Sequence, residues 1–341
     1  MRIAVMGIGS LGTIVGALLA KGGVQADLID ASREIVDALN RDGATVTGSM
    51  ELNMPVKACC PDEATGMYDM VILLTKQLYN EAALGQIMPH LHANSVVCTL
   101  QNGIPEDSVA MIVGKERTMG GSVGFGATWI KPGVSALTSP AESLKKFAFD
   151  IGEIDGVMRP RLHEIKKVLE NVGGTEIILN LMQVRWTKVL ANATFSGMSA
   201  SLGCSFGDVL NNPQAMVCIA HLADETIKVA HSAGIRLTKL LGEDMEFLEL
   251  KDEADVANKM AFYHKVWGPH AKLKASMLQD LEKGKRTEID YINGVVSKRG
   301  REKGVPTPYN DKVVELVKEA EAKGMVPDFA TNLKRFEVLF R

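Results

Sequence analysis

Three polar residues recur at helical spacing in an otherwise apolar stretch near the middle of the sequence. Lys188 and Asn192 are four residues apart, and Ser196 follows after four more. All three would share one face of a helix that we predict over residues 184–200. If they are buried, these polar side chains need hydrogen-bonding partners. The alternative is an ordinary lysine on a solvated helix face, which the neighbours Leu190 and Phe195 weaken without excluding.

Glu288 is a second candidate for chemistry, and it stands in the pattern Thr287-Glu288-Ile289-Asp290. The pattern fits a capping box in which Thr287 is the cap and Asp290 reaches back to it. Glu288 would then lie in the first turn of a new helix, where the helix dipole favours an anion. This structural role is sufficient to explain Glu288, so its spacing alone requires no catalytic function.

The first thirty residues predict a dinucleotide site. An apolar strand at residues 3–5 leads into glycines at G-x-G-x-x-G spacing, a helix over residues 11–21 and a strand over residues 24–29 that ends at Asp30. Such a loop lets a pyrophosphate approach the backbone at a helix N-terminus, and an acid at the next strand end supports this interpretation. The loop residues are Gly7, Ile8, Gly9, Ser10, Leu11 and Gly12.

A secretory signal is the other interpretation of this apolar N-terminus. Signal peptides have an unbroken apolar core, whereas glycine, serine and threonine interrupt this one at the loop positions. A net charge of −3 gives no sign of a nucleic-acid or membrane partner. The odd number of cysteines, five, and the absence of any C-x-x-C motif favour reduced thiols in a cytoplasmic protein and no metal site.

Strands and helices alternate up to about residue 180, which predicts a parallel sheet with helices on both faces. Lys76 and Asn102 follow apolar strands, as Gly7 and Asp30 do, so these four residues should lie along the ligand-binding edge of the sheet. Beyond residue 180 the periodicity is helical. We therefore expect an α/β Rossmann-type domain over residues 1–180 and an all-α domain over residues 181–341 that carries substrate and catalytic residues.

These features together resemble the ketopantoate reductase (2-dehydropantoate 2-reductase) family over nearly the whole chain. The resemblance rests on the glycine loop, Lys76, the triplet at 101–103 (Gln-Asn-Gly) and the Lys188-x-x-x-Asn192 pair. Its most specific part is the pair of blocks at 276–280 (Ser-Met-Leu-Gln-Asp) and 287–294 (Thr-Glu-Ile-Asp-Tyr-Ile-Asn-Gly).

The resemblance implies roles for individual residues. Lys188 would be the general acid in the reduction of a 2-oxo acid by NAD(P)H, because burial lowers a lysine pKa toward neutral. Glu288 would hold the substrate hydroxyl and border the cofactor. Asn192, Ser196, Ser276 and Asn102 would bind substrate, with Asn102 also on the nicotinamide side, and Lys76 would line the cofactor cleft. The site would lie between the domains, and the product would be pantoate, for pantothenate and coenzyme A biosynthesis.

Two positions depart from the family pattern. The family often has an amide where this chain has Ser196, which puts the identity of the substrate in doubt. NADPH-using members place a basic residue where this chain has Asp30, so we expect NADH to be slightly favoured over NADPH. Arg33, three residues further on, could still reach a 2′-phosphate.

Two alternatives stay open from the sequence. One is a paralogous reductase of another branched 2-oxo acid, and the other is a non-catalytic protein that senses NAD(P). A homodimer is compatible with the sequence but is not indicated by it, and we assign no role to residues 242–268.

Overall fold

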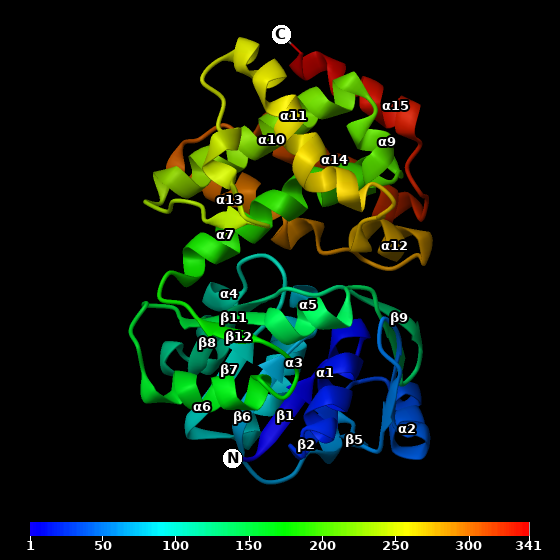
Figure 1. The fold of residues 1–341 in the computed structure, drawn as a ribbon, viewed down its shortest axis with the longest axis vertical. Coiled ribbons are helices and arrows are strands. Elements are labelled where there is room, and N and C mark those ends of the chain that lie inside the picture. Colours follow the sequence, from blue (N-terminus) through cyan, green and yellow to red (C-terminus); the bar gives the residue numbers. More distant parts are fainter. Residues whose placement is uncertain (341) are drawn as a thin grey trace. The chain divides into compact units, whose positions relative to one another are not determined.

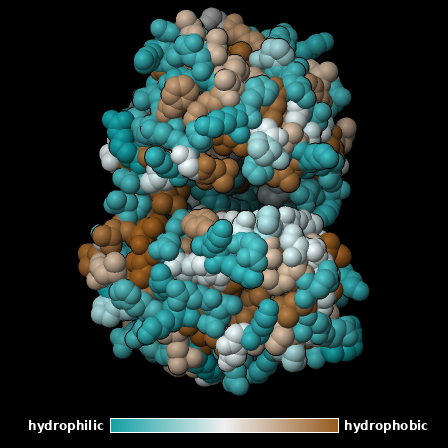
Figure 2. Space-filling view, in the orientation of Figure 1, coloured by the Kyte–Doolittle hydropathy of each residue, from teal (hydrophilic) through white to brown (hydrophobic). Residues whose placement is uncertain are grey.

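The computed structural model describes residues 1–340, and the chain divides into two compact units. The first unit comprises Met1–Leu181, and the second begins at Met182 (Figure 1). Polar residues cover most of the visible surface of each unit (Figure 2). Among the described residues, none of the helices has both the length and the apolar character needed to cross a membrane.

An eight-stranded sheet organises the first unit, in the order β12-β11-β8-β7-β6-β1-β2-β5. The strands β7, β6, β1, β2 and β5 are mutually parallel, so their carboxyl ends meet at one edge. The strands of this sheet are β1 (Ile3–Met6), β2 (Ala26–Ile29), β5 (Lys57–Cys59), β6 (Tyr68–Leu73), β7 (Leu91–Thr99), β8 (Thr118–Val123), β11 (Phe149–Glu153) and β12 (Thr175–Ile177). The parallel sheet expected from the alternation of elements is confirmed for the mutually parallel strands and for β8, whereas β11 runs antiparallel to β8.

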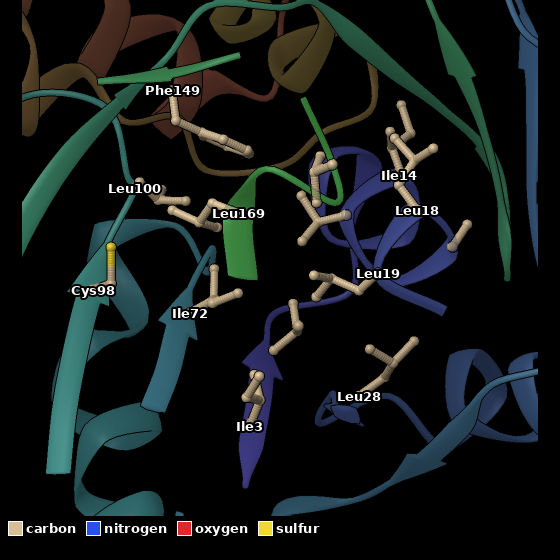
Figure 3. Packing of buried hydrophobic residues seen from close by; sticks show 14 of the residues in the cluster. Ile3, Ile14, Leu18, Leu19, Leu28, Ile72, Cys98, Leu100, Phe149 and Leu169 are labelled. Atoms are coloured by element: carbon tan, nitrogen blue, oxygen red, sulfur yellow. The ribbon is translucent and has the colours of Figure 1, made fainter. Parts of the chain in front are cut away.

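Apolar clusters cover both faces of this sheet. One cluster joins strand residues such as Ile3 and Ile72 to α1 and α6, and Figure 3 shows Ile14, Leu18 and Leu169 packed there. The opposite cluster joins the sheet to α3 and α4. The helices of this unit are α1 (Ser10–Lys21), α2 (Arg33–Asp42), α3 (Asn80–Ile87), α4 (Glu106–Val113), α5 (Ala141–Lys146) and α6 (Pro160–Leu169).

A second, four-stranded sheet lies in the order β4-β3-β10-β9 and packs against α1. Its strands are β3 (Ala44–Gly48), β4 (Leu52–Met54), β9 (Ala127–Lys131) and β10 (Val134–Leu137). In this sheet β3 is an interior strand, between β4 and β10. Alternating polarity indicates one solvated face but does not reveal that β10, ninety residues later in the chain, pairs with β3 in parallel.

The second unit is helical, apart from a short hairpin of β13 (Lys239–Leu240) and β14 (Glu243–Asp244). The helix α10 packs against α11, α13 and α14. The helices are α7 (Leu181–Ala191), α8 (Gly197–Leu202), α9 (Phe206–Leu210), α10 (Pro213–Ser232), α11 (Val256–Trp267), α12 (Ser276–Glu282), α13 (Asn293–Lys303), α14 (Pro308–Lys323) and α15 (Phe329–Lys334), with a π-helical segment at Asn192–Ser196. The α/β plus helical fold class is confirmed.

The stretch at 242–268, to which the sequence assigned no role, is tied to α10 by polar contacts. Glu246 accepts hydrogen bonds from His231 at 2.7 Å and from the Leu237 N–H. Asp224 of α10 accepts the Leu250 N–H at 2.8 Å. These contacts give the stretch a structural role in covering α10.

Candidate active site

Each glycine of the nucleotide loop meets a different requirement of the backbone. Gly7 has φ +94°, and a Cβ there would lie 2.6 Å from the Thr75 nitrogen. A Cβ on Gly12 would lie 2.1 Å from the Gly7 carbonyl oxygen, so helix α1 can begin this close to the loop only with glycine. A Cβ on Gly9 would meet nothing within 4 Å. Gly9 therefore faces open space at the N-terminus of α1, which fits an approaching pyrophosphate.

Asp30 braces this loop. Its Oδ2 accepts the Ile8 N–H at 2.7 Å, and its Oδ1 accepts the Ser32 N–H at 2.9 Å. The carboxylate thus joins the glycine loop after β1 to the turn after β2. The sequence analysis took Asp30 as the acid that supports a dinucleotide site. It did not predict that this carboxylate bonds to the glycine loop itself.

Lys76 and Asn102 follow β6 and β7, which are adjacent and parallel, so both residues lie at the same edge as the glycine loop. The side chain of each is partly exposed. The buried Gln101 joins their two loops, because its Nε2 donates to the Thr75 carbonyl at 2.7 Å and to the Asn80 Oδ1 at 2.6 Å. We predicted no role for Gln101 from the sequence, although it stands in the same triplet as Asn102.

The polar face expected over residues 184–200 does not lie on one regular helix. The run changes from α7 to the π segment at Asn192 and returns to α-helix at Gly197. Lys188, Asn192 and Ser196 are all partly exposed, whereas Val189 and Phe195 are buried. The π turn inserts an extra residue per turn between Asn192 and Ser196 and so changes the direction of Ser196 relative to Lys188.

Asn293 braces the π segment from another helix. Its Nδ2 donates to the Ala193 carbonyl oxygen at 2.9 Å and also lies 3.0 Å from the Asn310 Oδ1. A Cβ on Gly197 would lie 2.7 Å from the Asn293 Oδ1, so glycine allows this close approach. The block at 287–294 and the stretch that carries Asn192 are therefore brought together by this amide.

Glu288 is buried, with 8% of its surface exposed, directly before the short 3-10 turn Ile289–Tyr291. The predicted capping box is wrong. The Thr287 N–H and hydroxyl both donate to Glu321 of α14 at 2.6 Å, and Asp290 pairs with Lys318 at 2.5 Å. Local spacing could not show this, because the partner of Thr287 lies 34 residues away.

Ser276 is exposed as the first residue of α12, which packs against α8 and the π segment. The Ala275 N–H, next to it, donates to the buried Ser199 Oγ of α8 at 3.1 Å. The segments that carry Asn192, Ser276 and Glu288 thus lie together in the second unit. The glycine loop, Asp30, Lys76 and Asn102 lie together in the first unit.

One group among residues 1–340 has the side chains for a metal site: His231, Glu246 and Glu249. Each ring nitrogen of His231 already faces a carboxylate, Nε2 toward Glu246 at 2.7 Å and Nδ1 toward Glu249 at 3.5 Å. The Arg236 guanidinium also contacts Glu246 at 3.1 Å. These contacts make the group an ion-pair network, and it shares no residue with the candidate active site.

Comparison with protein families gives two matches. The family model described as ketopantoate reductase PanE/ApbA matches residues 3–146, and the model of its C-terminal domain matches residues 180–321. The chain is 28% identical to a 2-dehydropantoate 2-reductase of Pyrococcus horikoshii, over 95% of this chain and 99% of the relative. It is 27% identical to the enzyme of that name from Archaeoglobus fulgidus, over 94% and 98%.

Solved structures agree on the fold. A D-mandelate dehydrogenase in a ternary complex with NADH and anilino(oxo)acetate is 25% identical, with a TM-score of 0.80 over 95% of this chain and 99% of that one. A PanE/ApbA family ketopantoate reductase from Ralstonia eutropha, at 23% identity and TM-score 0.79, covers the same shares and shows the same fold. The chain therefore belongs to the ketopantoate reductase family, a family of NAD(P)-dependent oxidoreductases.

Proposed function

We propose that this protein reduces 2-dehydropantoate to pantoate with a reduced nicotinamide cofactor, and that it favours NADH. One observation carries the proposal. Lys188 and Asn192 lie on one helical stretch, and Asn293, from the block at 287–294, donates a hydrogen bond to the π segment of that stretch. The relatives that bear the name 2-dehydropantoate 2-reductase support the substrate, since they match about the whole chain.

The proposed reaction draws on both units. When bound, the reduced nicotinamide supplies the hydride for the ketone carbon. Lys188 donates the proton that the resulting alkoxide oxygen requires. Asn192, Ser196 and Ser276 orient the 2-oxo acid, and Glu288 accepts a hydrogen bond from the substrate hydroxyl. The glycine loop, Lys76 and Asn102 hold the cofactor, with Asn102 on the nicotinamide side.

The test is an absorbance assay with 2-dehydropantoate and either NADH or NADPH. We expect Lys188→Ala to lower kcat by about 10²–10⁴-fold, the usual effect of losing a general acid, with cofactor affinity retained. Lys323→Ala is the matched control, because this lysine is exposed and pairs with Glu319 at the end of α14. Wild-type kcat in Lys188→Ala would refute the proton-donor role, and the absence of turnover in the wild type would favour the cofactor-sensing alternative.

A second candidate is the reduction of another branched or aromatic 2-oxo acid. Ser196 favours it, because a serine offers one donor where the family often has an amide. The likeness to a D-mandelate dehydrogenase bound to anilino(oxo)acetate also favours it. A panel of 2-oxo acids compared by kcat/KM decides between the two: a higher value for an aromatic acid than for 2-dehydropantoate would replace the first proposal.

Three further expectations remain predictions. The NADH preference rests on the negative charge of Asp30 at the end of β2. The cytoplasmic location rests on the cysteine count, and its measurement is fractionation of the source cells. The homodimer would be checked by the mass of the purified protein in solution.

A further inference from the structure

A two-pronged ion pair lies next to Asp30 at the carboxyl edge of the main sheet. Arg33, the first residue of α2, places Nη2 at 2.9 Å from the Glu63 Oε1 and Nη1 at 3.1 Å from the Glu63 Oε2. Glu63 closes the short 3-10 turn Pro61–Glu63 that follows β5. Because β5 pairs in parallel with β2, residues 29 and 59 lie side by side, and the residues after them share one end of the sheet.

Glu63 is held in place independently of Arg33. Its Oε2 also accepts the Cys60 N–H at 2.9 Å, which fixes the carboxylate against the start of its own turn. Arg33 and then this N–H lower the pKa of Glu63, so the carboxylate is charged at neutral pH. Glu63 is therefore a preorganised anion that faces the guanidinium of Arg33.

The position of this pair gives it a consequence for the cofactor. In dinucleotide-binding α/β domains, the end of the second strand meets the adenosine ribose, and a nearby arginine accommodates the 2′-phosphate of NADP. Arg33 is the arginine that, from its place in the sequence, we expected to be able to reach this phosphate. To bind a 2′-phosphate in the usual forked geometry, Arg33 would have to release Glu63 and leave that carboxylate beside a phosphate dianion.

We propose that Glu63 is a specificity-determining residue that withholds Arg33 from the 2′-phosphate of NADPH. The inference rests on the proposed function only in requiring that the glycine loop binds a nicotinamide dinucleotide. The two side chains are 53% and 44% exposed, and exposed ion pairs contribute little to folding stability. A substitution at Glu63 should therefore change cofactor selection and leave the protein folded.

The experiment measures the dissociation constants of NADH and NADPH by fluorescence titration of the full-length protein without substrate. In Glu63→Gln the amide oxygen can still accept the Cys60 N–H, but the charge is lost. We expect the affinity ratio of NADPH to NADH to rise about tenfold, the effect of one charge-assisted hydrogen bond. The gain should disappear in the double variant Arg33→Ala/Glu63→Gln.

The matched control is Glu142→Gln, because Glu142 is also exposed and paired with a cation, Lys145, at 2.7 Å on α5. The ratio of NADPH affinity to NADH affinity in Glu142→Gln should equal that of the wild type. An unchanged ratio in Glu63→Gln, or a gain that persists without Arg33, would overturn the inference while cofactor binding itself stands. A wild type that binds neither nucleotide would overturn the proposed function together with the inference.

Discussion

Glu225, buried on α10, gives a prediction whose magnitude follows from its surroundings. Its Oε1 accepts the Tyr309 N–H at 2.8 Å, and its Oε2 accepts the Asn310 N–H at 2.9 Å and the Asn310 Nδ2 at 2.7 Å. The carboxyl group thus caps the first turn of α14. Burial raises its pKa to about 7, although these three donors act in the opposite direction.

The sign of the stability effect follows from proton binding. In the unfolded chain the carboxyl returns to its ordinary pKa of 4.5. Between this value and about 7 the folded protein keeps a proton that the unfolded chain has released, so stability falls as pH rises through this window. A shift of this size corresponds to about 3 kcal/mol, present below the lower value and lost above the upper one.

Urea unfolding of the wild type and Glu225→Gln from pH 5 to pH 8 measures this effect. The glutamine does not titrate, so the stability advantage of the wild type over the variant should shrink by about 2.5 kcal/mol between the two ends of the range, since part of the full shift is already lost at pH 5. The comparison cancels the other titrating groups that the two proteins share. An advantage that stays constant across the range would refute the reasoning, because it would mean that the three donors keep Glu225 ionised throughout.

Three further predictions concern the site. Gly12→Ala should destabilise the protein by about 1–3 kcal/mol, because its Cβ would lie 2.1 Å from the Gly7 oxygen. Gly9→Ala should keep the wild-type Tm and lose NADH affinity, since its Cβ enters the open space of the loop. Thermal unfolding and NADH titration test the two glycine variants. An unchanged Tm in Gly12→Ala, or an unchanged NADH affinity in Gly9→Ala, would contradict these predictions. Asn293→Ala should leave the Ala193 carbonyl without this donor and lower kcat/KM for the 2-oxo acid while NADH affinity is kept; equal losses of both would indicate general unfolding instead.

The sequence was most informative where the signal is local. The glycine loop and the apolar strands are read from adjacent residues, and the strand ends then place Gly7, Asp30, Lys76 and Asn102 at one edge of the sheet. The partner of Thr287 could not be predicted, since it is Glu321, 34 residues further on. The π segment was also missed, because helical periodicity does not show where one turn takes an extra residue.

Long-range polar contacts also connect features that the sequence showed separately. Glu225 holds Asn310, Asn310 contacts Asn293, and Asn293 holds the Ala193 carbonyl in the segment of Asn192. Glu225 therefore lies at one end of a buried series of hydrogen bonds, and the other end of the series reaches the segment of Asn192, the amide that we propose binds substrate. A substitution that removes one of these hydrogen bonds should therefore lower both the stability and the turnover of the protein.

Asp30 shows how the loop and the proposed cofactor preference depend on one another. Its carboxylate cannot turn away from the strand end without releasing the Ile8 N–H and the Ser32 N–H. The negative charge is therefore a fixed part of the loop, and a 2′-phosphate placed there would face Asp30 and Glu63 together. Replacing Asp30 itself by a basic residue would therefore do more than change the charge at this edge. Such a substitution must also provide a new acceptor for the Ile8 N–H, because otherwise the glycine loop loses the contact that joins it to β2.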